Sequence, residues 1–227
     1  MKFSLTLALL SIIPAALGKL LGQDVSHYQG NVDWKAQKEA GSNFAFIKAT
    51  ESTTYIDSSF NANYNGAADA GIIRGAYHFA RPAASSGKSQ ANYFLKHGGG
   101  WSGDGKTLPG ALDLEFNPDG DTCYGLSTSD MVAWIKDFSD TYHAETNRYP
   151  VIYTTKSWWD QCTGSSTAFG KTHPLWLARY ADAPGANPAG WSVYSFWQFN
   201  DKGTLAGDNN YWNGDLDGLK KFAKIAE

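Results

Sequence analysis

The sequence predicts an α/β fold: a single irregular (β/α) barrel of the TIM type, with a helix-poor C-terminal half. Three observations support this prediction. Strand-like runs alternate with helix-like segments, which implies a mostly parallel sheet with right-handed crossovers. About eight strand-like runs fit into the chain, a number that favours a closed barrel over an open sheet. The 227 residues, 42% of them apolar, show no linker-like break, so we expect one domain with a sizeable core.

In the first part of the chain, each predicted strand is followed by a predicted helix. Gly41 is a stop signal for the first helix, and Ser127 or Ser129 is a cap for the longest one, whose apolar residues recur at helical spacing. The strands are expected at 20–25, 43–50, 72–80 and 107–115. The helices are expected at 33–41, 58–71, 85–100 and 127–146.

The alternation changes after residue 146. Strand-like runs continue, but Gly- and Pro-rich connections rather than long helices separate them. The strands are expected at 150–155, 174–181 and 191–199, and a closing helix at 216–226. This change is the reason for predicting a C-terminal half with few helices.

The first 18 residues, MKFSLTLALLSIIPAALG, have the features of a secretory signal. They contain one basic residue, an apolar run and a small-residue end, and they are too short for a membrane-spanning helix. No other uninterrupted apolar run approaches spanning length. We therefore expect a signal peptide at 1–18 and a secreted, extracellular domain at 19–227.

Charge and motifs exclude several classes of function. The net charge is −3 and no basic run occurs, so we expect no nucleic-acid or membrane partner, and a monomer is the default expectation. The five histidines show no H-E-x-x-H motif and no i, i+4 pair on a helix, which predicts no metal site and no cofactor. The chain contains no G-x-S-x-G motif, so the sequence gives no support for a serine hydrolase.

Two cysteines, Cys123 and Cys162, are the only ones in the chain. An even number of cysteines in a secreted protein is typical of a disulfide. A disulfide that closes the 39-residue span between them contributes about 4 kcal/mol to the free energy of unfolding in the chain-entropy model.

Polar and aromatic residues recur at the C-terminal ends of the predicted strands, where barrels of this type hold their catalytic groups. These residues are Asp24, Lys48, Glu51, Tyr77, His78, Asp113, Glu115, Tyr153, Trp176, Arg179, Trp197 and Gln198. Aromatic rings stack on sugar faces as readily as they fill cores, and both interpretations stay open for the aromatic members. His78 fits a substrate contact or a core hydrogen bond equally well. Lys48 and Glu51 fit a mutual ion pair as well as a substrate contact.

The segment PGALDLEF at 109–116 holds two carboxylates, Asp113 and Glu115, separated by one leucine. Residues two apart in a strand point to the same face, so these two acids share one face. These two acids and Asp24 are expected to lie close together, so ionising all three would cost free energy through charge repulsion. The pKa of at least one of them is therefore expected to rise. A protonated acid beside an ionised one is the chemistry of glycosidic cleavage. The alternative is a structural pair of strand-end acids.

The chain resembles the Chalaropsis-type lysozymes, which are N-acetylmuramidases of glycoside hydrolase family 25. The resemblance covers nearly all of the sequence after the predicted signal, and the order and spacing of its segments make it specific. The segments are GQDVSHYQGNVDW (22–34), FAFIKATESTTYIDSSFNANYNGAADAGIIRGAYHF (44–79), LDLE (112–115), YPVIYT (149–154), PLWLARY (174–180) and FWQF (196–199).

The resemblance implies an irregular β/α barrel that cleaves the β-1,4 bond between N-acetylmuramic acid and N-acetylglucosamine in peptidoglycan, with retention of configuration. It implies Glu115 as the general acid, with Asp113 and Asp24 as further catalytic carboxylates. The fourth acid falls at Asp208 in GDNNYWNG, where Asp215 and Asp217 are competitors. As hypotheses, the substrate's 2-acetamido group is the nucleophile and Asp113 orients it.

The resemblance also bears on the residues around the cleft. The expected substrate-binding residues are Tyr77, His78, Tyr153, Trp176, Trp197, Gln198, Lys48, Glu51 and Tyr55. One departure from the family pattern is Ser52, which stands where the family usually has glycine, while Lys48, Glu51, Tyr55 and Asp57 around it match.

Two alternatives to a muramidase differ from this sequence in their acidic residues. A family 18-type chitinase carries D-x-D-x-E, and the first acid of that motif is replaced here by Ala111. A non-catalytic glycan-binding module typically loses the acid, whereas this chain keeps Asp24, Asp113 and Glu115. Both observations favour a lysozyme over the alternatives.

Overall fold

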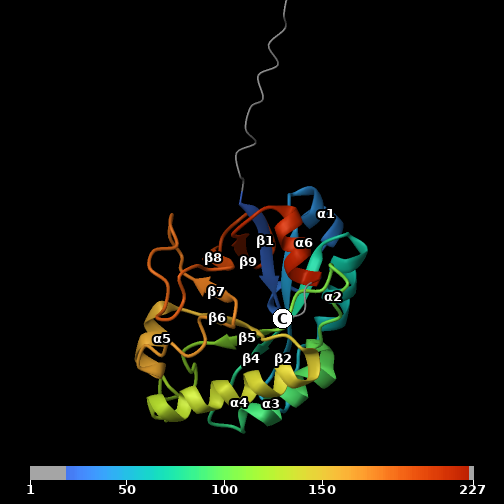
Figure 1. Cartoon of the computed structure of the whole chain (residues 1–227). Helices are drawn as coiled ribbons and strands as arrows, with labels where there is room; N and C mark the ends of the chain where they lie inside the picture. The colour runs from blue at the N-terminus through green and yellow to red at the C-terminus, as the bar shows by residue number, and fades with distance from the viewer. Residues whose placement is uncertain (1–18, 225–227) are drawn as a thin grey trace, which may run out of the picture.

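The computed structural model describes residues 19–224, so the predicted signal peptide at 1–18 lies outside the described residues. One sheet runs in the order β1-β9-β8-β7-β6-β5-β4-β2-β3, and pairing of β1 with β2 closes it into a barrel (Figure 1). The pairs from β1 through β2, β4, β5, β6 and β7 to β8 are parallel. Only β9 runs antiparallel to both of its neighbours, β8 and β1. The predicted barrel is confirmed.

The barrel strands are short and match most of the predicted ranges. They are β1 (Leu20–Val25), β2 (Phe44–Glu51), β4 (Ile73–Phe79), β5 (Ala111–Leu114), β6 (Val151–Thr154), β7 (Leu175–Ala178), β8 (Phe196–Asn200) and β9 (Asp208–Trp212). The two-residue strand β3 (Tyr55–Ile56) pairs with the end of β2 and lies outside the closed ring.

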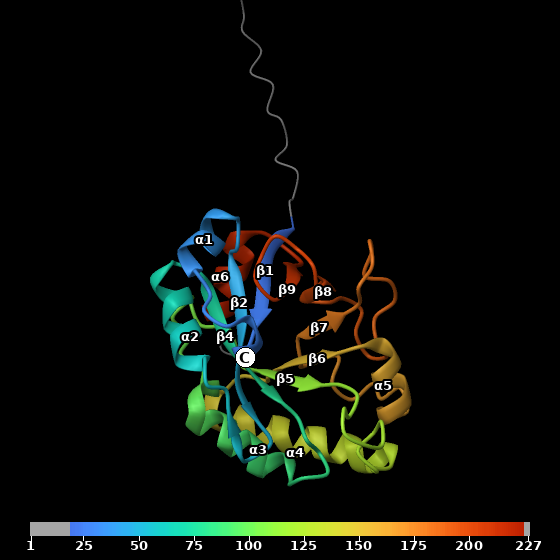
Figure 2. The same cartoon turned by 180° about the vertical axis from the view of Figure 1, so that it is seen from behind.

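Helices pack around the barrel beside most of its strands, leaving the region of β8 and β9 uncovered, and α6 closes one end (Figures 1 and 2). They are α1 (Trp34–Glu39), α2 (Phe60–Asp69), α3 (Gly87–Phe94), α4 (Thr128–Thr146), α5 (Lys156–Thr163) and α6 (Leu216–Lys224). A 3-10 turn spans His27–Gln29, and a π-helical turn, Leu95–Gly99, follows α3. The side chain of Ser127 caps α4 by accepting a hydrogen bond from the amide of Asp130, which decides between the two predicted caps.

Two apolar clusters lie on the two faces of the sheet. The inner cluster includes Phe44, Phe46, Trp176, Phe196 and Trp212. Leu219 and Ala223 of α6 belong to it, so this helix seals the end of the barrel at which the parallel strands begin. The outer cluster lies between the strands and helices α2 to α5. The barrel is therefore filled at that end, and its opposite end, where the parallel strands finish, is the one open for a site.

Besides β3 and the 3-10 turn, the structure contains a barrel strand and a helix that the sequence did not predict. Strand β9 was missed because its inward positions carry Asp208 and Asn210 rather than apolar residues. Helix α5 was missed because it is short and was interpreted as part of a connection. The predicted helix 85–100 is divided between α3 and the π-helical turn, where Gly98 takes a φ of 107°.

The packing of α3 against α4 depends on a glycine. A Cβ atom at Gly87 would lie 2.3 Å from the carbonyl oxygen of Trp134 and 2.5 Å from the amide of Phe138. We expect Gly87→Ala to destabilise the fold by about 1–3 kcal/mol, because backbone atoms of a helix cannot give way as a side chain can. Thermal unfolding measures the loss. Gly100→Ala is the matched control, since a Cβ there meets nothing within 4 Å, and equal melting temperatures of the two variants would contradict this account.

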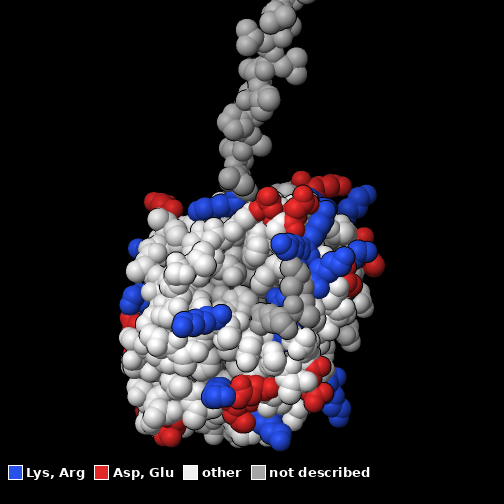
Figure 3. All heavy atoms as spheres, in the orientation of Figure 1, with Lys and Arg blue, Asp and Glu red and all other residues white. Residues whose placement is uncertain are grey.

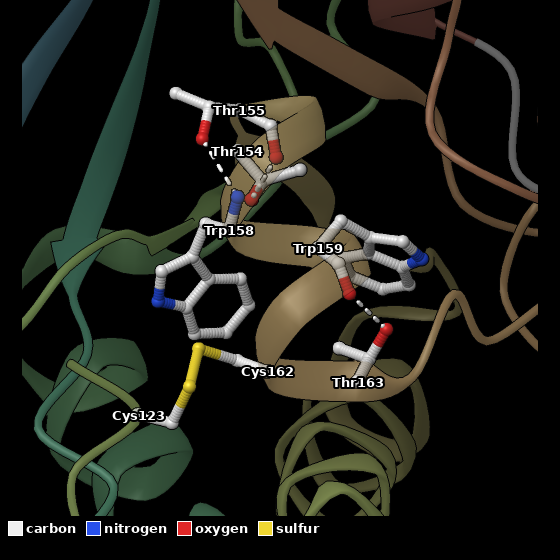
Figure 4. Close-up of a disulfide and its surroundings, with 7 residues drawn as sticks. All are labelled: Cys123, Thr154, Thr155, Trp158, Trp159, Cys162 and Thr163. Atoms are coloured by element: carbon white, nitrogen blue, oxygen red, sulfur yellow. Dashed lines mark hydrogen bonds between the residues drawn. A yellow bond between two sulfur atoms is a disulfide. The ribbon is translucent and has the colours of Figure 1, made fainter.

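The predicted disulfide is confirmed: Cys123 and Cys162 are bonded. Figure 4 shows Cys162 on α5 reaching Cys123, with the ring of Trp158 beside the bond. Thr155 caps α5 through the amide of Trp158. The bond ties α5 to the segment that follows β5, eight residues after Glu115.

Candidate active site

Four acidic residues meet at the open end of the barrel, where parallel strands finish. Asp24 belongs to β1, Asp113 lies in β5, Glu115 follows that strand, and Asp208 begins β9. Asp24 and Asp208 are register partners in the β1–β9 pair. Asp113 and Glu115 share a face because they are two residues apart. The predicted pair of acids therefore lies together with acids from two other strands.

Asp24 is held by two amide side chains. Its Oδ2 accepts hydrogen bonds from Nδ2 of Asn210 at 2.7 Å and from Nε2 of Gln198 at 3.0 Å. Burial and the neighbouring charge of Asp208 raise the pKa of Asp24 to about 8, although both hydrogen bonds act in the opposite direction. Asp24 is thus protonated at neutral pH.

Gln198 connects Asp24 with Asp208. Its Nε2 also donates to Oδ2 of Asp208 at 3.0 Å, and its Oε1 accepts from the hydroxyl of Tyr153 at 2.9 Å. The tyrosine hydrogen bond fixes which end of the amide faces the acids. Gln198 and Tyr153, which were predicted to bind substrate, therefore also orient two carboxyl groups.

Asp208 accepts a further hydrogen bond from Tyr180, whose hydroxyl lies 3.0 Å from Oδ2. Burial raises the pKa of Asp208, and this hydrogen bond partly opposes the shift. Its competitors lie elsewhere: Asp215 accepts from the amide of Gly218 at 2.7 Å, and Asp217 lies in the first turn of α6. Asp208 alone among the three lies with Asp24.

Asp113 and Glu115 act as one proton-holding pair. Burial first, and then the charge of Glu115, raise the pKa of Asp113 well above its usual range. Burial also raises the pKa of Glu115, while a hydrogen bond from Asp113 and the charge of Lys48 lower it. The pKa values of both carboxyl groups are thus raised, and the larger rise is that of Asp113. Asp113 is 5% exposed, and Glu115 is the more accessible of the two.

One oxygen of Asp113 is left without a partner. Among the described residues, Oδ1 of Asp113 is buried and makes no hydrogen bond. Such an acceptor normally costs stability, because it has lost water without replacing it.

The pKa of Asp24 predicts how stability depends on pH. The folded protein keeps this proton up to about pH 8, whereas an unfolded aspartate releases it near 3.8. Stability should therefore fall as the pH rises, with a slope approaching ~1.4 kcal/mol per pH unit for one proton. Burial lowers the pKa values of His78 and His173 to about 4. Between about pH 4 and 6.5 these histidines are protonated mainly in the unfolded chain, so their contribution makes stability rise with pH over that range. The Asp24 contribution is unopposed by these histidines between pH 6.5 and 8.

We expect Asp24→Asn to flatten the decline in melting temperature between pH 6.5 and 8 and to be more stable than the wild type at pH 8. An asparagine oxygen can still accept from Asn210 and Gln198, so the hydrogen bonds are kept. Thermal unfolding across this pH range measures the effect. Asp69→Asn, at an exposed position on α2, should keep the wild-type slope; identical slopes for both variants would show that Asp24 is not the titrating group.

Three aromatic residues form the floor beneath the acids. Tyr77, Tyr153 and Trp176 pack together, with ring centroids of Tyr153 and Trp176 4.6 Å apart. Nε1 of Trp176 donates to Oδ1 of Asn210 at 2.7 Å, which turns the amide of Asn210 toward Asp24. Trp176 is only 2% exposed, so it supports the site from below rather than offering a sugar platform.

An ionic cluster forms one wall of the cleft. Lys48 Nζ lies 2.7 Å from Oε2 of Glu51, and Arg81 Nη2 lies 2.7 Å from Oε1 of the same carboxylate. These cations hold the pKa of Glu51 below its usual value even though burial opposes this. The ion pair between Lys48 and Glu51 is the interpretation that the geometry favours.

The segment after β2 supports this wall. The Tyr55 hydroxyl lies 3.0 Å from Nδ1 of His27, and that nitrogen is 2.8 Å from Oδ2 of Asp57. Ser52, the departure from the family pattern, has a φ of 52°. Glycine adopts this left-handed conformation without the steric penalty that serine meets, which explains the glycine of the family pattern.

Two expected substrate-binding residues lie outside the cleft. His78 is fully buried behind the sheet, with Nδ1 2.7 Å from the Thr50 hydroxyl and Nε2 2.9 Å from Oε1 of Gln90. Trp197 also points outward from the barrel, and its Nε1 donates to the carbonyl of Arg179 at 2.8 Å. Adjacent strand residues face opposite sides, so Tyr77 and Gln198 point inward while their neighbours His78 and Trp197 do not. This placement corrects the expectation for both.

The sequence reasoning missed Asn210 and Tyr180, and also Arg81, which lies two residues after β4. Asn210 follows Asp208 at the spacing of two that places both on the inner face of β9, and recognising the strand would have found it. Tyr180 ends the segment PLWLARY two residues after β7. It is 54% exposed, and nothing in its immediate sequence signals contact with Asp208.

Other features of the described part of the chain bear on ligands. Within residues 19–224, no group of three or more His, Cys, Asp or Glu side chains is arranged to hold a metal ion. In the same residues, no helix is long and apolar enough to cross a membrane. On the face in Figure 3, Lys and Arg gather beside acidic residues near α6, and much of the remaining surface is uncharged.

The fold and the site together define a class: a β/α-barrel enzyme whose candidate active site is a group of carboxyl groups at the end of the barrel where the parallel strands finish. The sequence matches the model of glycosyl hydrolases family 25 over residues 23–208. The chain therefore belongs to this family and is a glycoside hydrolase, which confirms the resemblance noted from its motifs.

Individual relatives agree with this assignment. The chain is 54% identical over 206 residues to an N,O-diacetylmuramidase of Chalaropsis sp, covering 89% of this chain and 98% of the relative. It is 51% identical to lysozyme M1 of Streptomyces globisporus, covering 94% of this chain and 74% of the relative. The solved muramidase from Acremonium alcalophilum is similar to it with a TM-score of 0.89 and 55% identity, over 91% of this chain and 99% of that one.

Proposed function

We propose that this protein is a secreted lysozyme that hydrolyses the β-1,4 bond between N-acetylmuramic acid and N-acetylglucosamine in bacterial peptidoglycan. The observation that carries the proposal is the Asp113–Glu115 pair, which holds a proton at the open end of the barrel beside Asp24 and Asp208. The muramidase and lysozyme names of the similar proteins support the choice of substrate. Residues 19–227 form the catalytic domain, and 1–18 are its signal peptide.

Glu115 is the general acid. It is more accessible than Asp113, so it can reach the oxygen of the scissile bond. The proton that rests on Asp113 passes to Glu115 when substrate excludes water from the pair. Glu115 then protonates the leaving oxygen, and Asp113 is left charged. This transfer produces the acid and the carboxylate that the reaction requires from a single shared proton.

Asp113 then orients the substrate's own nucleophile. The charged carboxylate of Asp113 is a suitable acceptor for the N–H of the 2-acetamido group. A charged Asp113 would stabilise the positive charge that this group acquires as its carbonyl oxygen attacks the sugar carbon. Substrate-assisted hydrolysis of this kind retains the anomeric configuration. Asp24 and Asp208, with Gln198 between them, would bind sugar hydroxyls on the opposite side.

The chitinase-like alternative gains no support from the geometry. Ala111, which stands at the position of its additional acid, is fully buried in the inner apolar cluster. A carboxylate there would be isolated from water without a partner.

The proposal is tested by incubating the purified protein with a bacterial cell-wall suspension and following turbidity. Proton NMR of the first products of a soluble wall oligosaccharide then reports the anomer. We expect clearing and an initial β-anomer. An initial α-anomer would remove the substrate-assisted mechanism, and walls that bind the protein without clearing would favour a glycan-binding module.

A further inference from the structure

Aromatic residues also gather on the outer surface of the β8–β9 hairpin. Trp197 and Phe199 of β8 and Tyr211 of β9 point away from the barrel interior, and the rings of Phe199 and Tyr211 stack at 4.1 Å with 9° between their planes. In the described chain, no helix lies between β7 and β8 or between β8 and β9. This aromatic surface therefore lacks the helical cover that α2 to α5 give the other strands (Figures 1 and 2).

The surface forms the wall of an open groove of about 720 Å³. Polar groups surround the rings: Asn200, Asp182 and the hydroxyl of Tyr180 also line the groove. Lys19 lies at one end, with Nζ 4.7 Å from the ring centre of Trp197 and 5.4 Å from that of Tyr211. Among the described residues, Lys19 has no carboxylate partner within ion-pair distance. Flat rings with a polar rim are the combination that sugars require.

The groove is continuous with the active site through Tyr180. This residue lines both the groove and a smaller hollow of about 280 Å³ that also contains Tyr153 and Gln198. Its hydroxyl donates to Asp208, so the ring stands directly between the carboxyl groups and the aromatic surface. A polymer held at the acids therefore has an aromatic surface to continue onto past Tyr180.

We propose that this groove, lined by Tyr180, Phe199, Tyr211 and Lys19, is a second binding site for the glycan strand of peptidoglycan, outside the carboxylate cleft. The inference rests on the proposed function. Sugar rings pack against the exposed parts of Phe199 and Tyr211. The ammonium group of Lys19 pairs with a carboxylate of a peptide stem, which gives an otherwise acidic protein a local attraction for an anionic polymer.

The test compares a long and a short substrate. The variants are Tyr211→Leu and Phe199→Leu, which keep apolar bulk but remove the flat ring, and Lys19→Gln, whose exposed position leaves the fold unaffected. Tyr93→Leu on α3 is the matched control, because it makes the same substitution on a different face of the protein. The measured quantity is kcat/KM on intact peptidoglycan divided by kcat/KM on a tetrasaccharide of two disaccharide units, with thermal unfolding to confirm folding.

We expect this ratio to fall about 3- to 10-fold for each of the two ring variants and to stay at the wild-type value for Tyr93→Leu. Lys19→Gln should lower it more at low salt than at high salt. Unchanged ratios, or equal losses on both substrates, would overturn the second site. So would a dimer that Tyr211→Leu dissociates without changing the ratio. A wild-type protein that cleaves neither substrate would instead refute the proposed function.

Discussion

Replacing Glu115 by glutamine is expected to lower the rate of peptidoglycan hydrolysis by about 10³-fold or more, within the range that loss of a general acid produces. This corresponds to about 4 kcal/mol of activation free energy. Glutamine has nearly the same shape and still accepts the hydrogen bond from Asp113, but its amide cannot donate a proton to a leaving oxygen. The fold should be unaffected, because the substitution removes a carboxyl group whose burial is unfavourable.

The control is Glu39→Gln, the same change at an exposed position on α1. It should keep full activity. Initial rates of reducing-end release from purified peptidoglycan distinguish the two variants, and co-sedimentation with the walls shows whether Glu115→Gln still binds. Wild-type rates for Glu115→Gln would remove this residue from the chemistry. A weakened binding with unchanged kcat would reassign it to substrate recognition.

Removing the disulfide is expected to cause the largest loss of stability. The bond closes a span of 39 residues, which corresponds to about 4 kcal/mol in the chain-entropy model. For a protein of this size, that is a fall in melting temperature of roughly 8–16 °C. Cys123→Ala with Cys162→Ala tests it, since alanine leaves no thiol to mispair and no hydroxyl to bury beside Trp158.

Reduction of the wild-type protein is the second arm of this test. It should give the same lower melting temperature as the double variant, which separates loss of the bond from loss of the sulfur atoms' packing. The catalytic consequence should be smaller, because Glu115 lies on the strand side of the tethered segment. A melting temperature within about 2 °C of the wild type in both arms, less than 1 kcal/mol, would mean that the bond constrains little.

The barrel could be predicted from the sequence because the spacing of apolar residues indicates which segments are strands and which are helices. The order of these segments along the chain then indicates the fold. The runs FAFIKAT and ALDLEF alternate between the two faces of the sheet, and their strand ends place Lys48 and Asp113 on the inner face. The same pattern predicts that Asp24 and Glu115 lie in one cleft. Strands β1 and β2 were located to within one residue for the same reason.

The parts that were missed depend on contacts between distant residues. Strand β9 is recognisable only when Asp208 is paired with Asp24 across the closing edge of the barrel. His78 was predicted at the cleft without applying the alternation of faces to its neighbour Tyr77. The larger rise in the pKa of Asp113 also escapes the sequence, because it depends on relative depth: Asp113 is buried deeper than Glu115.

The most direct test of the proposed activity is the identity of the new reducing ends. Purified peptidoglycan is digested with the wild-type protein, reduced with borohydride, hydrolysed in acid and analysed for amino-sugar alcohols. We expect muramicitol, the alcohol of muramic acid, with no increase in glucosaminitol. Glucosaminitol as the main product would mean that the enzyme cleaves on the other side of each disaccharide, and the assignment as a muramidase would be wrong.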